Sequence, residues 1–96
     1  MEAPPAPDIA TFRHQFGHDN FDVTWGCRES LRDRGLTAAI AIRAICDDNA
    51  RVVGSRPHHR ATIYTVVTDL DGARIRVEIL IVRGQGRPLL WGVVTT

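Results

Sequence analysis

The feature that most constrains the fold is an Asp-Gly pair, Asp71-Gly72, which separates two long runs rich in β-branched side chains. Such a pair between residues 60–70 and 73–83 is typical of a two-residue hairpin turn. Isoleucine and valine alternate with arginine and glutamate over residues 74–79. One side of the hairpin should therefore be buried against another layer, while the other side carries charge.

Three further stretches predict strands. Residues 89–94 form a β-type run after a glycine-containing turn at Gly84–Pro88. Arg51–Val53 predicts a short strand, and Gly54–His59, which contains a proline, predicts a loop. Phe21–Trp25 alternates apolar and polar residues and predicts a short strand or extended segment.

The first half of the chain predicts helices. Asp8 is a good cap for a helix that ends at Gly17, with apolar side chains spaced along one face. A second helix is expected at Arg28–Arg34, terminated by Gly35. A third, from Ala38 to about Asp47, is apolar nearly all round and must be buried.

Helices followed by strands indicate an α+β fold, with N-terminal helices packed on a C-terminal sheet of three to four antiparallel strands. The length of 96 residues fits one domain, expected at residues 9–96. Residues 1–8 hold three prolines and predict a flexible tail.

The charge is nearly balanced overall, at +1, but is uneven along the chain. Residues 1–50 hold five arginines against eight acidic residues, or −3, and residues 51–96 hold seven against three, or +4. A basic sheet half suits RNA or an acidic protein partner. All 12 basic residues are arginine, which reflects either a GC-rich genome or a use for bidentate phosphate contacts.

Nothing in the sequence indicates export or a membrane span, so the cytoplasm is the expected location. Cys27 and Cys46 are expected to be free thiols, because they lack the spacing and histidine partners of a zinc site. No metal or other cofactor is expected.

The order of elements resembles that of the small RelE-superfamily toxins, including the BrnT-like families. Three stretches carry the resemblance: Phe21–Trp25, the helix with Arg34-Gly35 and Thr37 after it, and the closing strand Trp91–Thr96. It implies a metal-free endoribonuclease of a bacterial toxin–antitoxin system, often ribosome-associated and neutralised by a cognate antitoxin protein.

The chain departs from this pattern at two positions. Related domains often place a histidine at the start of the first of the two paired helices, where this chain has Gly26 or Cys27. A second arginine, one turn before the Arg-Gly pair, would fall at Ser30.

Metal-free RNA cleavage needs a base for the ribose 2′-hydroxyl, cations for the phosphate and an acid for the leaving oxygen. The densest group of suitable residues is Arg56, His58, His59 and Arg60. We expect His58, His59 and Arg60 to be catalytic and Arg56 to bind phosphate. The alternative is an exposed polar loop.

Two other groups complete the expected site. Arg74, Arg76 and Glu78 share one strand face, where Glu78 would act in catalysis and the arginines would bind RNA phosphates. Arg83 and Arg87 flank a glycine-rich loop that could hold a phosphate. The alternatives are a solvated sheet face with cross-strand pairs and a plain hairpin turn.

Two other functions remain open. The chain could be a non-catalytic binding protein of antitoxin, immunity or phage type that blocks a protein partner. It could also form a homodimer by pairing its apolar last strand across a two-fold axis.

Overall fold

The computed structural model describes residues 7–95 and has an α+β architecture, as the sequence predicts. Of the expected tail, residues 1–6 lie outside this description. The elements, in chain order, are α1 (Ile9–Gly17), β1 (Asp22–Val23), α2 (Trp25–Asp33), α3 (Ala39–Ile45), β2 (Arg51–His58), β3 (Ala61–Leu70), β4 (Ala73–Val82) and β5 (Leu89–Thr95).

The sheet has five strands in the order β1-β5-β4-β3-β2, so the prediction of three to four antiparallel strands is wrong. Strands β2 to β5 form an antiparallel meander, and β1 joins its end in parallel with β5. The amide of Asp22 donates to the carbonyl of Pro88 at 3.0 Å, and that of Thr24 to Leu90 at 3.1 Å. These bonds make the segment after α1 part of the sheet.

The predicted hairpin is confirmed. Strands β3 and β4 pair along their whole length, from Ala61 opposite Val82 to Leu70 opposite Ala73. Asp71 and Gly72 have φ angles of 52° and 81°, and two such left-handed residues match the right-handed twist of the flanking strands.

The predicted loop at Gly54–His59 is wrong, because β2 continues through it to His58. A register shift between Val52 and Gly54 leaves Val53 as the extra residue of a bulge. Pro57 is tolerated because β2 is an edge strand, where a missing N–H need not interrupt a ladder.

All three predicted helices are present, but some of them begin or end at other residues than predicted. The Asp8 carboxylate accepts from the Thr11 amide at 3.0 Å and caps α1. Trp25, predicted as the end of a strand, begins α2, because the Thr24 hydroxyl accepts from the Cys27 amide. The third helix is shorter than expected and ends at Ile45.

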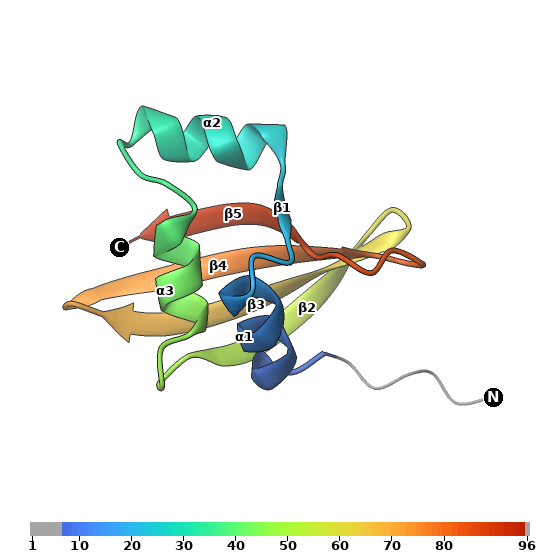
Figure 1. Cartoon of the computed structure of the whole chain (residues 1–96), viewed down its shortest axis with the longest axis horizontal. Coiled ribbons are helices and arrows are strands. Elements are labelled where there is room, and N and C mark those ends of the chain that lie inside the picture. Colours follow the sequence, from blue (N-terminus) through green and yellow to red (C-terminus); the bar gives the residue numbers. More distant parts are fainter. Residues whose placement is uncertain (1–6, 96) are drawn as a thin grey trace.

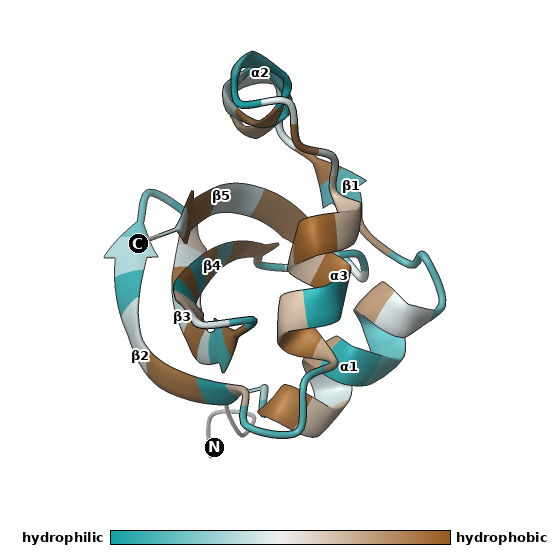
Figure 2. Cartoon of the chain, turned by 90° about the vertical axis from the view of Figure 1, so that its left-hand side faces the viewer, coloured by the Kyte–Doolittle hydropathy of each residue, from teal (hydrophilic) through white to brown (hydrophobic). Residues whose placement is uncertain are grey.

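Helices α1 and α3 cover one face of the curved sheet, whereas α2 lies beside β5 (Figures 1 and 2). Phe12 and Phe16 of α1, Ile45 of α3, and Val66 and Val77 of the sheet are fully buried in this core. The Arg13 guanidinium donates to the carbonyls of Ile45 and Asp47, at 3.2 and 2.7 Å, and so joins α1 to the end of α3. Within residues 7–95, no helix is long and apolar enough to cross a membrane.

Candidate functional site

The sheet face directed away from α1 and α3, here called the open sheet face, carries most of the residues selected from the sequence. Side chains alternate between the two faces of a strand, so the residues between the core positions of β3 and β4 point to this face. Strand pairing groups these residues with neighbours from β2 and β5. The face carries Arg56, His58, Ile63, Thr65, Arg74, Arg76, Glu78, Leu80, Trp91 and Val94.

An ion pair between Arg56 and Glu78 crosses the middle of the open sheet face. The two residues belong to β2 and β4, so the contact spans the intervening strand β3. The Glu78 side chain is only 15% exposed, whereas that of Arg56 is 52% exposed. Gly92 lies opposite Glu78 in β5 and has no side chain to cover the carboxylate, which is therefore open on that side.

His58 and Trp91 meet at one end of the same face, with ring centroids 4.8 Å apart. Their strands, β2 and β5, are separated by both β3 and β4. Side chains of strands so far apart can touch only if the sheet curls strongly, so the open face is concave at this end. Ile63 and Leu80 lie on this face and are buried, although they are not part of the core beneath the helices.

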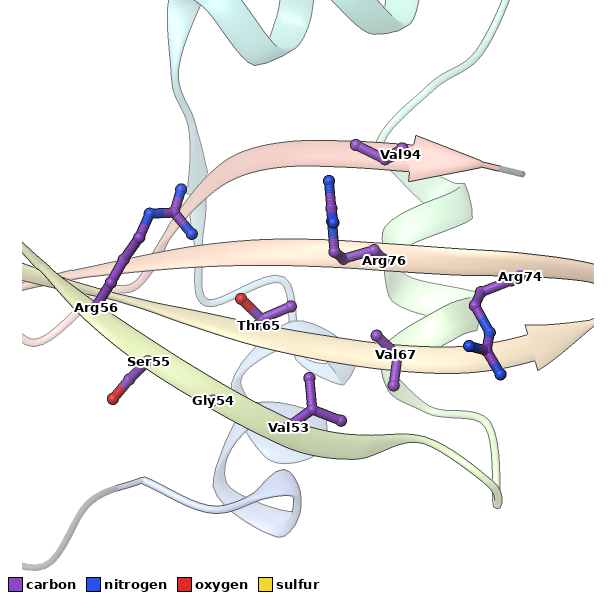
Figure 3. A pocket seen from close by; sticks show the side chains of 9 residues that line it. All are labelled: Val53, Gly54, Ser55, Arg56, Thr65, Val67, Arg74, Arg76 and Val94. Carbon is purple, nitrogen blue, oxygen red and sulfur yellow. The ribbon is translucent and has the colours of Figure 1, made fainter.

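A hollow of about 560 Å³ continues from Arg56 toward the other end of the face (Figure 3). Its walls combine three arginines with valines, contributed by all four strands of the meander. Figure 3 shows Arg56 and Arg76 extending from β2 and β4 toward β5. Arg74 pairs with Asp69 at 3.4 Å, whereas Arg76 has no acidic partner within the described residues.

The other predicted site residues lie at the rim of this face or away from it. His59 and Arg60 form the exposed turn between β2 and β3, and the His59 ring is 4.7 Å from that of His58. Arg83 lies next to this turn, because its amide donates to the carbonyl of Arg60 at 3.3 Å.

Arg87 lies at the β1 edge of the sheet. Its guanidinium pairs with Asp22 at 3.3 Å and donates to the carbonyl of Phe21 at 2.9 Å, which anchors the start of β1. The structure thus places Arg56, His58, Arg74, Arg76 and Glu78 on one face, with three more residues at its rim, whereas Arg87 is held by Asp22 at the β1 edge. Trp91 joins the residues selected from the sequence: it is the extra residue of a bulge in β5, and no local pattern signals that its ring lies beside His58.

A second groove, of about 390 Å³, separates α2 from the edge of β5. The RelE-type resemblance expects a histidine at Gly26 or Cys27 and an arginine at Ser30, and all three of these residues line the groove, together with Trp91. The Arg34 guanidinium instead donates to the carbonyl of Val93 at 2.6 Å and holds α2 against β5. None of the side chains that line this groove is charged.

Cys27 also lines this groove but is buried. Burial raises the pKa of its thiol, which outweighs the opposing effect of the nearby Arg34 charge. It is therefore poorly suited to act as a nucleophile. Among residues 7–95, no group of three or more His, Cys, Asp or Glu side chains could hold a metal ion.

No protein-family model, curated protein or solved structure matches the chain.

Proposed function

We propose that this protein is a metal-independent endoribonuclease, the RelE-like toxin of a bacterial toxin–antitoxin pair, and that RNA binds along its open sheet face. The observation that carries the proposal is that one sheet face holds two side chains suited to acid–base chemistry, Glu78 and His58, together with Arg76, which has no acidic partner among the described residues. The proposed setting is the bacterial cytoplasm, with RNA and an antitoxin as partners.

The proposed reaction needs only side chains of this chain. A base removes the proton from a ribose 2′-hydroxyl, and the oxygen attacks the adjacent phosphorus. The bond to the 5′-oxygen breaks as an acid protonates that oxygen, which leaves a 2′,3′-cyclic phosphate and a 5′-hydroxyl. Glu78 is the proposed base and His58 the proposed acid, with His59 and Arg60 beside them at the rim.

Arginines bind the phosphates in this proposal. Arg56 contacts Glu78 in the free protein, and an incoming phosphate would draw its half-exposed guanidinium away and release the carboxylate. Arg74, Arg76 and Arg83 extend the positive charge along and beyond the face. The Trp91 ring, beside His58, offers a surface on which an unpaired base can stack. Arg87 has no part, because it anchors β1.

The test is cleavage of an end-labelled single-stranded oligoribonucleotide in the presence of EDTA, with the cyclic phosphate detected by mass spectrometry. We expect His58→Ala and Glu78→Gln to slow cleavage by about 10²-fold or more. Arg76→Ala should weaken RNA binding, whereas Arg87→Ala, which removes the same charge elsewhere, should not. Cleavage of the matched oligodeoxyribonucleotide, which has no 2′-hydroxyl, would contradict the mechanism.

A non-catalytic binding protein is the second candidate, and one observation favours it. Gly26, Cys27 and Ser30 lie in the α2–β5 groove at the positions where the RelE-type resemblance expects a histidine and an arginine. Under this alternative the open sheet face holds an acidic partner protein and leaves RNA intact. Absence of cleavage by the folded wild-type protein, over a panel of RNA sequences, would favour this function over the first.

A further inference from the structure

The α2–β5 groove lies where β5 has no neighbouring strand on one side. Strand β1 pairs with β5 only at Leu89 and Leu90, and beyond these residues β5 faces α2 instead (Figure 2). The helix therefore occupies the side of β5 on which two copies of the chain would have to pair their last strands. The space between helix and strand stays open because α2 presents only Gly26 and Ser30, one turn apart, on this flank.

The groove adjoins the open sheet face along β5. Val94 lines both the groove and the hollow that holds the three arginines. Gly92 also lines the groove, and a Cβ atom added to it would lie 3.9 Å from Oε1 of Glu78. The Trp91 ring, a further part of the wall, has its centroid 4.8 Å from that of His58. The proposed base and the proposed acid thus both lie next to residues that line the groove.

The lining of the groove differs in chemistry from the open sheet face. It combines the Trp91 ring with glycines, valines and two hydroxyl groups, and none of its side chains is charged. The Thr24 hydroxyl already bonds to the Leu90 carbonyl and the Cys27 amide, whereas Ser30 is exposed. A phosphate would lose hydration here without gaining a counter-charge. An uncharged planar ring with polar edges would gain a stacking surface and hydrogen-bonding groups.

We propose that the α2–β5 groove holds one unpaired nucleobase of the bound RNA, while the neighbouring phosphates stay with the arginines of the open sheet face. Because this site rests on the proposed binding of RNA to that face, it also defines the substrate class. The groove, at about 390 Å³, is larger than one base. A base can enter it only after leaving its stack and its pairing partner, so the substrate is single-stranded.

An extended peptide of a partner protein is a poorer occupant of the groove. Addition of a strand to a sheet edge uses the backbone groups of that edge for hydrogen bonds. On this side of β5 the carbonyl of Val93 already accepts from the Arg34 guanidinium, at 2.6 Å. A base needs no such continuous row of backbone partners.

An affinity measurement with two probes separates base binding from phosphate binding. One probe is a short single-stranded oligoribonucleotide, and the other is an abasic ribose–phosphate chain of the same length. Both carry 2′-O-methyl groups, so the proposed reaction cannot cleave them. Fluorescence anisotropy with the wild-type chain should show about tenfold tighter binding of the probe that carries bases, as expected for stacking of one base.

Filling the groove should remove this preference. A Cβ at Gly26 meets nothing within 4 Å, and leucine is a better helix former than glycine, so Gly26→Leu should fill the groove without loss of stability. Ser30→Leu fills the groove from the next turn of the helix. Both variants should bind the two probes equally and keep the wild-type affinity for the abasic chain, because no arginine is changed.

Gly17→Leu is the matched control, since it makes the same change in a helix on the other side of the sheet. A Cβ at Gly17 would meet only the Cys46 sulfur, at 4.0 Å. This variant should keep the preference for bases. Circular dichroism and urea denaturation of all three variants check that each is folded.

Two results would overturn the groove as a base site and leave the RNA-binding face intact. One is equal affinity of the wild type for the two probes, and the other is a preference for bases that survives both Gly26→Leu and Ser30→Leu. Binding of neither probe would overturn both proposals. A preference that depends on the groove, without cleavage of unmodified RNA, would support the base site and reject the ribonuclease.

Discussion

Arg56 and Glu78 form an ion pair across β3, and this pair joins the edge strand β2 to the central strand β4 over the open sheet face. Because Glu78 is largely shielded from water while Arg56 is half-exposed, the carboxylate depends on its partner more than the guanidinium does. The contact therefore affects both the stability of β2 and the availability of the proposed base.

Removing the arginine should cost more stability than removing the glutamate charge. We expect Arg56→Ala to lower the free energy of unfolding by about 1 kcal/mol, because it leaves a shielded carboxylate without its partner. Glu78→Gln should cost less, since the amide needs no counter-charge. Urea denaturation measures both.

Arg87→Ala is the matched control for this comparison. Its pair with Asp22 has both side chains more than half exposed, so its loss should cost less than about 0.5 kcal/mol. Equal costs for Arg56→Ala and Arg87→Ala would show that the Arg56–Glu78 pair has no special role in stability.

Expression of the intact chain in a bacterium should arrest growth if the proposed toxin function is correct. The triple variant His58→Ala/His59→Ala/Arg60→Ala should relieve the arrest, since it removes the proposed acid and its neighbours from the rim of the face. Growth curves after induction measure this. Arg43→Ala, whose side chain pairs with Asp71 at 3.0 Å on another part of the surface, should remain toxic. Unimpaired growth with abundant folded wild-type protein would reject the toxin and favour the binding function.

The stability that Asp8 contributes to α1 should depend on pH. Hydrogen bonds from the backbone and side chain of Thr11 lower the pKa of the Asp8 carboxyl below its ordinary value. A group with a lowered pKa stabilises the fold above its unfolded-state pKa and loses that contribution as the pH falls through the folded-state value. The melting temperatures of the wild type and Asp8→Ala should differ at neutral pH and converge in strong acid. A constant difference at all pH values would exclude the capping interaction as its source.

The two cysteines should differ sharply in reactivity. Cys27 is buried with a raised thiol pKa, whereas Cys46 is exposed at the end of α3. Iodoacetamide at neutral pH should modify Cys46 quickly and Cys27 only after the chain unfolds. Peptide mapping by mass spectrometry follows each site. Fast modification of Cys27 in the native protein would mean that α2 opens away from β5.

Local features of the sequence determined the parts of this fold that depend on neighbours in the chain. The hairpin forms where Asp71-Gly72 supplies two left-handed residues, and α1 begins where Asp8 can cap it. The alternation in β4 likewise predicts which side chains are buried, because successive residues of a strand point to opposite faces. The excess of arginine over acidic residues in the second half is likewise a property of the sequence alone.

Tertiary structure alone decided which of these residues meet. Parallel pairing of Asp22 with Leu89 joins segments far apart in the chain, and no local pattern signals such a contact. The same is true of the curl that brings His58 to Trp91, and of the ion pair that holds Arg87 against Asp22 at the β1 edge of the sheet. Propensity and periodicity describe each strand by itself, whereas the order of strands and the curvature of the sheet depend on how the whole core packs.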